Sequence, residues 1–388
     1  MTDKKRILIA YSSTGGGHLA AGRALKESFI AQYGEESYDV ELLDLWKDHA
    51  PRFLGKIADS YPDVVETWLY RAVWRFTHSA IGAALVFGPS SVFVRRGFRR
   101  LFAQRRPDAI ISVHPCLNKP VLDALAPSFF SRGKAISRIP FFTVVTDPFT
   151  IHRSWVDNRA DSVFVSSQEA KEAALKFGAT EKQVRVTGHP IRASFLDAYR
   201  TKEERAILKT ELGLQANAPV VLVMSGGDGG DALIPVVQDL DDNFWGSGGQ
   251  IVVVCGRDEK TRKTLARMPW RGDVTVLGFV NDLDRWMSAA DIAVTKAGPG
   301  SVFECLAAGL PMILFKHFSP QEDGNVAFVE RNGLGQYAHV GGLGCATVNL
   351  LRRKIPETLR RLARFKSMPR ASSDIVSAIH AFLRKPES

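Results

Sequence analysis

The sequence contains little cysteine and no long apolar segment. Its four cysteines are scattered over 388 residues and include no C-x-x-C pair, so neither a thiolate zinc site nor a disulfide framework is predicted. The apolar run nearest in length to a membrane span, residues 80–88, is about half of the roughly 18–20 residues required. The first strand is too short for the apolar core of a signal peptide. We therefore expect a cytoplasmic protein.

The composition is that of a soluble globular protein, with 45% hydrophobic and 24% charged residues. A chain of 388 residues is long for one core and suits two domains. The net charge is +10, and one cluster of arginines stands out. On charge alone this cluster suits nucleic acid, anionic lipid or solvent. Its members are Arg95, Arg96, Arg99, Arg100, Arg105 and Arg106.

Short apolar runs alternate with helical segments along the whole chain, which predicts an α/β protein with parallel sheets. Each half begins with a strand that enters a glycine-rich loop, and ligands of such sheets bind at the carboxyl ends of the strands. We predict an N-terminal domain over residues 1–192, a second domain over 193–372 and a final helix over 373–388 that packs back on the first domain. Strands are expected at residues 6–11, 40–43, 109–113, 141–146, 162–165, 183–187, 220–224, 250–255, 274–277, 292–295 and 312–315.

A glycine-rich turn at residues 296–300 is the most informative local feature. It follows a predicted strand, and Ser301 with Glu304 forms an S-x-x-E pattern that predicts a capping box at the start of a helix. Such a turn presents backbone N–H groups to a phosphate. A polar cluster follows at residues 321–325 and provides groups for sugar hydroxyls. Together they suggest a sugar-nucleotide site.

Seven stretches carry a resemblance to the GT-B glycosyltransferases, and more narrowly to family 28. They are residues 15–18 (GGGH), 107–115 (PDAIISVHP), 145–147 (VTD), 185–192 (RVTGHPIR), 254–257 (VCGR), 296–300 (KAGPG) and 321–325 (QEDGN). The forms of the second and sixth stretches look closest to the galactolipid synthases. The resemblance implies two Rossmann-like domains that face a cleft, with the acceptor and membrane on the first domain and the donor on the second.

The resemblance assigns the donor site to the second half. Glu304 would bind the ribose hydroxyls, and the backbone near Phe279 would hold the uracil, although a lone Phe279 would be taken as core. Diphosphate would lie against the glycine loops, and Gln321, Glu322 and Asn325 would bind the hexose. The whole expected set is Gly226, Gly227, Arg257, Phe279, Gly298, Gly300, Ser301, Glu304, Gln321, Glu322 and Asn325.

We expect neither a metal nor another cofactor. Asp239-x-Asp241 and Asp282-x-Asp284 superficially match a D-x-D metal motif. Both pairs fall on predicted helical surface, and no second ligand cluster accompanies them.

Two side chains of the first half are candidates for the general base. His18 directly follows the loop of Gly16 and Gly17, and a neutral imidazole can take the proton of an attacking hydroxyl. Asp147, at the end of a predicted strand, is the rival base or the residue that orients His18. His114 and His152 are weaker candidates. We favour His18.

An aromatic helical segment precedes the arginine cluster. Trp68 and Trp74 lie there beside arginines, a combination that suits a lipid headgroup interface. With Arg95, Arg96, Arg99 and Arg100 it predicts peripheral attachment to anionic lipid on the inner face of the cell membrane. A buried helix with a solvated face is the alternative.

The resemblance implies inverting transfer of a hexose from a UDP-sugar to diacylglycerol, with galactose favoured slightly over glucose. Nucleic acid is not expected as a partner. Transfer of N-acetylglucosamine to a lipid-linked peptidoglycan precursor is the alternative reaction. A non-catalytic regulator that binds sugar nucleotides is the alternative of another class.

Overall fold

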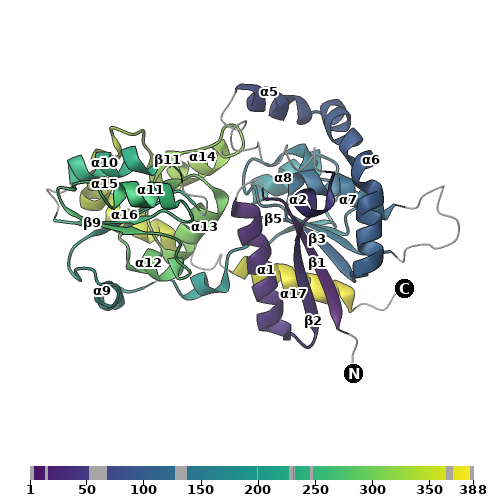
Figure 1. Ribbon diagram of the computed structural model, residues 1–388, viewed down its shortest axis with the longest axis horizontal. Helices are drawn as coiled ribbons and strands as arrows, with labels where there is room; N and C mark the ends of the chain where they lie inside the picture. The colour runs from purple at the N-terminus through teal and green to yellow at the C-terminus, as the bar shows by residue number, and fades with distance from the viewer. Residues whose placement is uncertain are drawn as a thin grey trace. The chain divides into compact units, whose positions relative to one another are not determined.

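This computed structural model describes residues 4–13, 16–51, 68–126, 138–198, 200–226, 230, 232–244, 248–363 and 370–384. The chain divides into two compact units (Figure 1). The first comprises Met1–Ala193, Ser319–Gln321 and Arg370–Ser388, and the second comprises Ser194–Phe318 and Glu322–Pro369.

The first unit contains a six-stranded sheet in the order β2-β1-β3-β4-β5-β6, and all neighbouring strands are parallel. The strands are β1 Lys5–Tyr11, β2 Tyr38–Asp44, β3 Ala109–Ser112, β4 Phe141–Val144, β5 Ser162–Val165 and β6 Val184–Val186. The helices are α1 Gly16–Tyr33, α2 Leu45–His49, α5 Trp68–Thr77, α6 Ala80–Arg105, α7 Asn118–Leu125, α8 Gln168–Lys176 and α17 Ala371–Leu383, with short turns η1 Pro115–Leu117 and η2 Arg153–Trp155.

Side chains of β1 alternate between two apolar layers because successive residues of a strand point to opposite faces. Ile7 and Ile9 pack with α1 and α17, whereas Leu8 and Ala10 pack in the layer that includes α6 and α7. The C-terminal helix α17 thus completes the core of the first unit, beside α1 (Figure 1).

The second unit repeats the plan, with a parallel sheet in the order β12-β11-β10-β7-β8-β9. Its strands are β7 Val220–Met224, β8 Gln250–Val254, β9 Asp273–Leu277, β10 Ile292–Lys296, β11 Met312–Lys316 and β12 Gly335–Tyr337. Its helices are α9 Lys202–Glu211, α10 Leu233–Phe244, α11 Glu259–Leu265, α12 Leu283–Ala289, α13 Pro299–Ala308, α14 Asp323–Arg331, α15 Leu343–Asn349 and α16 Ile355–Leu362. The prediction of parallel α/β architecture in both halves is confirmed.

The long helical region predicted over residues 53–102 consists, where described, of α5 and α6. Ser79 separates them, since its hydroxyl accepts a hydrogen bond from Gly82 N–H at 3.0 Å and so caps α6. None of the helices in the described ranges combines the length and the apolar character that crossing a bilayer demands.

Two features of the second unit differ from the sequence prediction. The short edge strand β12 was not predicted, because three residues starting with glycine give no periodic apolar signal. Asp239 and Asp241 are buried in α10 rather than exposed on a helical surface. Asp239 accepts hydrogen bonds from the amides of Gly341 and Leu343, and Asp241 accepts from that of Arg271, so both carboxylates anchor loops.

Candidate functional site

His18 lies at the point where three strand ends of the first unit converge. It is half-buried in the first turn of α1, directly after β1. Its Nδ1 is 2.9 Å from the carbonyl oxygen of Val113 after β3 and 2.9 Å from the hydroxyl of Thr146 after β4. Because a carbonyl can only accept, the neutral ring carries its proton on Nδ1 and its lone pair on Nε2.

Other histidines surround His18 and are uncharged at neutral pH. The rings of His18 and His114 meet edge to face with their centroids 4.5 Å apart. Burial lowers the pKa of His18 to about 4 and that of His189 to about 3. The pKa of His114 lies well below its ordinary value for the same reason. The cluster therefore provides lone pairs rather than positive charge.

Asp147 follows β4 and is almost fully buried, with 3% of its surface exposed. The indole Nε1 of Trp155 donates to its Oδ2 at 2.6 Å, and Gln321, which groups with the first unit, donates to Oδ1 at 2.8 Å. Burial raises the pKa of Asp147 to about 6, against the opposing effect of these hydrogen bonds. In the described residues no hydrogen bond joins Asp147 to His18, whose Nδ1 is held by the Val113 carbonyl.

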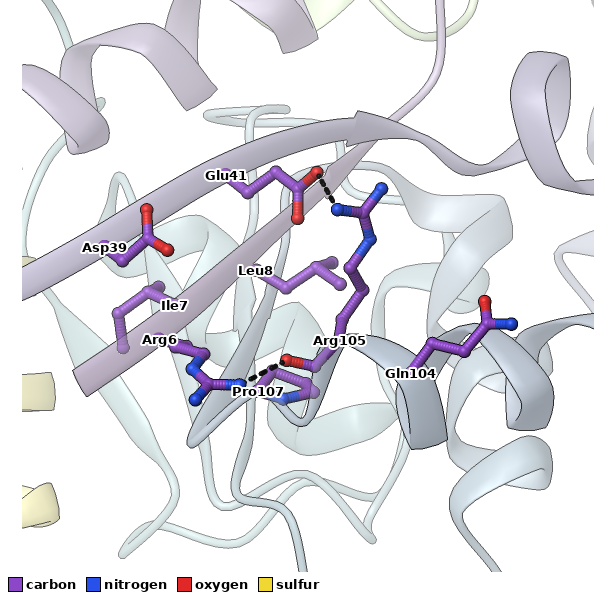
Figure 2. A pocket seen from close by; sticks show the side chains of 8 residues that line it. All are labelled: Arg6, Ile7, Leu8, Asp39, Glu41, Gln104, Arg105 and Pro107. Atoms are coloured by element: carbon purple, nitrogen blue, oxygen red, sulfur yellow. Dashed lines mark hydrogen bonds and ion pairs between the residues drawn. The ribbon is translucent and has the colours of Figure 1, made fainter. Parts of the chain in front are cut away.

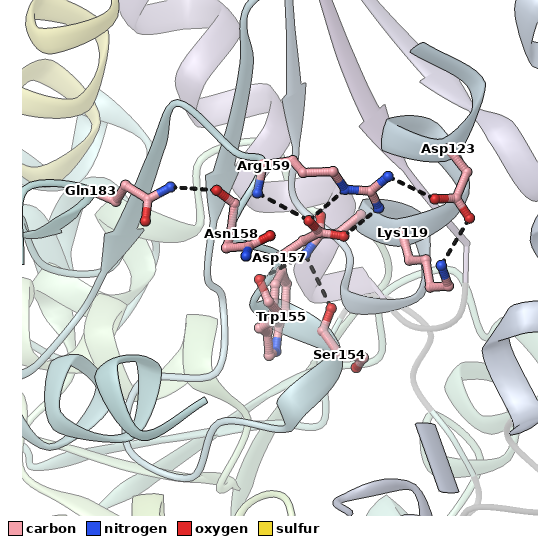
Figure 3. A network of polar contacts seen from close by, with 9 residues as sticks. Lys119, Asp123, Ser154, Trp155, Asp157, Asn158, Arg159 and Gln183 are labelled. Atoms are coloured by element: carbon pink, nitrogen blue, oxygen red, sulfur yellow. Dashed lines mark hydrogen bonds and ion pairs between the residues drawn. The ribbon is translucent and has the colours of Figure 1, made fainter. Parts of the chain in front are cut away.

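Trp155 was not identified from the sequence. It lies in η2, in a loop that ion pairs of Arg159 fasten to the unit (Figure 3). The guanidinium of Arg159 contacts Asp157 at 2.6 Å and Asp123 at 2.8 Å, and Lys119 contacts Asp123 at 3.0 Å. A tryptophan in a polar loop eight residues after a strand-end aspartate was the only available signal.

His152, a weaker candidate for the base, has a structural position instead. Its Nδ1 lies 2.8 Å from the Ser154 hydroxyl, and its Nε2 lies 3.1 Å from that of Thr77 at the end of α5. Burial lowers its pKa to about 4. The ring thereby connects α5 to the loop that contains Trp155.

In the second unit, the glycine-rich turn opens α13 differently from the prediction. Gly298 is the N-cap and makes no side-chain cap, and Pro299 is the first helical residue. The predicted Ser301–Glu304 capping box is therefore wrong, because the fixed φ of proline starts the helix earlier. Ser301 and Glu304 are instead half-buried residues within α13, and Gly300 lies in its first turn. The amides at this helix start are suited to a phosphate.

At the start of α14, Asn325 supports that turn and Glu322 holds the loop after β11. The Asn325 side-chain amide donates to the Ala297 carbonyl at 2.7 Å, and the Glu322 carboxylate accepts from Phe318 N–H at 2.8 Å. Both side chains are buried, so they are not a polar helix start in solvent. No sequence pattern indicated this scaffold role.

The loop after β7 provides a second glycine turn. Gly226 has φ +87°, a left-handed conformation that glycine adopts without strain. The buried hydroxyl of Ser225 has no hydrogen-bond partner within the described part of the chain. Gly227 lies outside the described residues.

Phe279 and Arg257 come together after the neighbouring strands β9 and β8. The guanidinium carbon of Arg257 lies 5.1 Å from the centroid of the Phe279 ring. Phe279 is 50% exposed, which overturns the expectation that it would be core if taken alone. An exposed ring beside a cation at the carboxyl edge of a sheet suits a nucleobase.

The predicted acceptor and membrane residues fall into two groups. Gly16, Gly17, Trp68, Arg96 and Arg100 are exposed, Trp68 to 78%. The others are half-buried: Trp74 stacks on His78 at 4.8 Å, and Arg95 borders a pocket with Asp123.

Arg99 does not belong to an exposed basic face of α6, as the arginine cluster had suggested. Its Nε donates to the Ala124 carbonyl at 2.8 Å, and another of its nitrogens donates to the Ala126 carbonyl. Arg99 thus caps the end of α7.

A separate pocket lies at the amino-terminal edge of the first sheet. It has a volume of about 300 Å³ and is lined by charged side chains that include Arg6, Glu41 and Arg105 (Figure 2). Arg105 pairs with Glu41 at 3.3 Å. Parallel sheets bind ligands at the opposite edge, so this pocket is not the candidate site. The described residues contain no group of three His, Cys, Asp or Glu side chains placed to hold a metal ion.

Comparison with known families matches both halves of the chain. Residues 18–191 match the model of monogalactosyldiacylglycerol (MGDG) synthase, and residues 220–378 match the glycosyltransferase family 28 C-terminal domain.

Individual proteins give the same result. Monogalactosyldiacylglycerol synthase 1, chloroplastic, of Arabidopsis thaliana is 35% identical over 343 residues, which cover 86% of this chain and 62% of that relative. Monogalactosyldiacylglycerol synthase 3, chloroplastic, of the same plant is 31% identical over 97% of this chain and 81% of the relative. The chain thus spans about three fifths of the length of the former. The MurG structure of Acinetobacter baumannii superposes with a TM-score of 0.59 at 15% identity, covering 98% of this chain and all of that one, and it confirms the GT-B fold.

Proposed function

Because this chain belongs to the monogalactosyldiacylglycerol synthase family, we propose that it transfers a hexose from a UDP-sugar to the free hydroxyl of diacylglycerol. The configuration at the anomeric carbon is inverted, and the product is a β-glycolipid. The observation that carries the proposal is that both halves match in one chain, the first to the MGDG synthase model and the second to the family 28 C-terminal domain. Galactose is favoured over glucose because the relatives' names specify galactose.

In the proposed reaction, the acceptor hydroxyl attacks the anomeric carbon while UDP leaves from the opposite face. His18 or Asp147 takes the hydroxyl proton. The amides at the start of α13 and in the Gly226 turn stabilise the departing diphosphate. We propose that no metal is required, so that EDTA leaves turnover unchanged.

On the donor side, Glu304 accepts hydrogen bonds from the ribose, and the uracil lies near Phe279 and Arg257. Gln321, Glu322 and Asn325 serve the hexose. For Asn325 the available group is the side-chain oxygen, because its nitrogen is engaged with Ala297.

One assay tests the donor and the acceptor together. Purified protein is incubated with diacylglycerol liposomes and UDP-galactose, UDP-glucose or UDP-N-acetylglucosamine, and the lipids are identified by mass spectrometry. We expect a monogalactosyl lipid. A glucosyl product would identify UDP-glucose as the donor. Transfer only to a lipid-linked peptidoglycan precursor would establish the alternative reaction, transfer of N-acetylglucosamine. Binding of UDP-sugar without transfer would support the regulator.

Glu304→Ala should weaken UDP binding about tenfold to a hundredfold, because hydrogen bonds to a charged group contribute about 1.5–3 kcal/mol. Isothermal titration calorimetry gives the affinity. Glu211→Ala, which removes a surface carboxylate that pairs with Arg285, is the matched control and should bind UDP normally. Unchanged affinity in a folded Glu304→Ala protein would exclude Glu304 as the ribose ligand.

We propose that α5 and α6 hold the protein on the cytoplasmic face of the membrane. Nine of the thirteen large hydrophobic side chains that are exposed in the described residues belong to these two helices. On α6, Ile81, Leu85 and Val92 share one face with Arg96 and Arg100, since these spacings are close to whole turns. An apolar stripe that continues into exposed arginines suits insertion below anionic headgroups.

The exposed residues of α6 are the ones to substitute in a test of this surface. Arg96→Ser with Arg100→Ser should weaken binding to anionic liposomes about 30-fold, since each arginine near the surface contributes about 1 kcal/mol. Salt should reduce wild-type binding because exposed charges are screened within about 10 Å at 0.1 M ionic strength. Ile81→Ser with Leu85→Ser should weaken binding to neutral liposomes as well. Co-sedimentation provides the measurement.

The control for charge is Lys176→Ser with Lys182→Ser, which removes two exposed cations elsewhere in the same unit. It should bind liposomes as the wild type does. Arg99 and Trp74 are unsuitable because both pack within the unit. Equal binding of all variants to neutral and anionic liposomes, independent of salt, would mean that the arginines only face solvent.

A further inference from the structure

The carboxylate of Asp147 differs from other buried aspartates in what surrounds it. The other buried aspartates of the described residues, Asp44, Asp239 and Asp241, each accept a hydrogen bond from a backbone amide. Asp147 is just as buried, yet within the described part of the chain it makes no ion pair and accepts only from the side chains of Trp155 and Gln321. Removing a carboxylate from water without a cation is costly, and such groups are enriched at functional sites. An ionised Asp147 is therefore energetically costly, and it lies at the same strand ends as His18.

Trp155 is the residue best placed to stabilise that charge. Its side chain is fully buried, and its Nε1–H donates to Asp147 Oδ2 at 2.6 Å. Hydrogen bonds to ionised acceptors are shorter and stronger than those between neutral groups. The indole ring also approaches the ring of His18, with centroids 6.1 Å apart. One side chain therefore contacts both candidates for the general base.

The loop around Trp155 is anchored on both sides. The Asn118 side-chain amide donates to the Trp155 carbonyl at 2.9 Å, and Arg159 forms the ion pairs shown in Figure 3. Gln183 donates to the carbonyls of Asn158 and Ala160 at 2.9 and 2.7 Å. These contacts fix the backbone that positions the indole, as contacts behind a catalytic group commonly do.

We propose that Trp155 is a positioning residue for glycosyl transfer, whose indole N–H keeps the buried Asp147 ionised and turned toward the acceptor hydroxyl. The inference rests on the proposed function, because it assumes that an ionised Asp147 serves the acceptor. It adds a residue that the sequence motifs did not identify.

The groups near Asp147 do not change their own charge near neutral pH. Cys116, from η1, is a thiol whose pKa burial and the Asp147 charge raise to about 12. His18, from α1, is uncharged because burial lowers its pKa to about 4. Gln321 and Trp155 do not titrate. Asp147, whose pKa burial raises to about 6, is thus the group that ionises between about pH 5 and pH 7.

The test compares kcat/KM against pH for the wild type and Trp155→Phe, which keeps the ring and removes the N–H donor. The wild type should lose activity below about pH 6. In Trp155→Phe the acidic limb of the pH profile should move up by about one pH unit or more, because the lost hydrogen bond favoured the ionised form of Asp147. Activity near pH 6 should then fall about fivefold or more and recover above about pH 8. Trp270→Phe, which loses a 2.9 Å indole bond to the Leu265 carbonyl in the second unit, is the matched control.

A uniform loss at every pH, with the limb in place, would overturn the proposal and leave Trp155 a packing residue. Arg159→Met, which loosens the loop but keeps the indole, should give a smaller shift in the same direction. Thermal unfolding provides a readout without turnover: Trp155→Phe should be more destabilised near pH 8 than near pH 5, since only the ionised carboxylate loses its strong partner. If the wild type transfers no sugar, the proposed function fails, and unfolding still decides the role of Trp155.

Discussion

His18→Ala should lower kcat by about a hundredfold to ten-thousandfold and leave UDP affinity unchanged, because general bases contribute about that much and act on the acceptor. His18 is the favoured base: the Val113 carbonyl fixes its proton on Nδ1 and leaves the Nε2 lone pair to accept one. Turnover is measured with the galactosyl transfer assay and UDP affinity by calorimetry. His380→Ala, which removes a histidine stacked on Tyr33 at 3.9 Å, is the control and should keep full turnover.

The pH profile shows whether turnover requires an ionised Asp147, and the two variants decide which residue is the base. Because the pKa of His18 is lowered to about 4, His18 remains an available base throughout the neutral range, and its protonation would reduce activity only near pH 4. The pKa of Asp147 is raised to about 6, so a requirement for ionised Asp147 would place the acidic limb there. Substantial turnover in His18→Ala, with none in Asp147→Asn, would reverse the two roles.

Asp147→Asn should abolish most turnover and at the same time stabilise the fold at neutral pH. Burial raises the pKa of Asp147 from 3.8 to about 6, so the folded state disfavours the charged form. Below pH 3.8 the carboxylate is protonated in both states and costs nothing. The cost develops between pH 3.8 and about 6 and then stays constant at about 3 kcal/mol, since one pKa unit corresponds to 1.36 kcal/mol.

Denaturant unfolding near pH 5 and near pH 8 measures this cost. The advantage of Asp147→Asn over the wild type should be about twice as large at the higher pH. Asp161→Asn is a matched control because that carboxylate accepts from Phe141 N–H at 2.9 Å and pairs with Arg138, so its removal should destabilise the protein. A destabilised Asp147→Asn protein would show that the carboxylate serves the fold rather than the site.

The sequence by itself determined the architecture and the family. Short apolar runs fix strands such as β5 and β7 at the predicted residues, because a buried parallel strand needs little beyond local β-forming side chains. The glycine-rich turns were recognisable because only certain residues allow them, as Gly226 at φ +87° illustrates. The motifs from GGGH to QEDGN were sufficient to identify the family, which the comparisons confirm.

Only the tertiary structure decided how individual polar side chains are used. Asn325 supports the turn at Ala297, and Arg99 caps α7, although the sequence suggested a sugar ligand and a lipid contact. Trp155 reaches Asp147 because a loop folds back between strand ends. The physical reason is that hydrogen bonds and pKa shifts depend on burial and on partners distant in the chain, whereas strands and glycine turns follow from neighbouring residues.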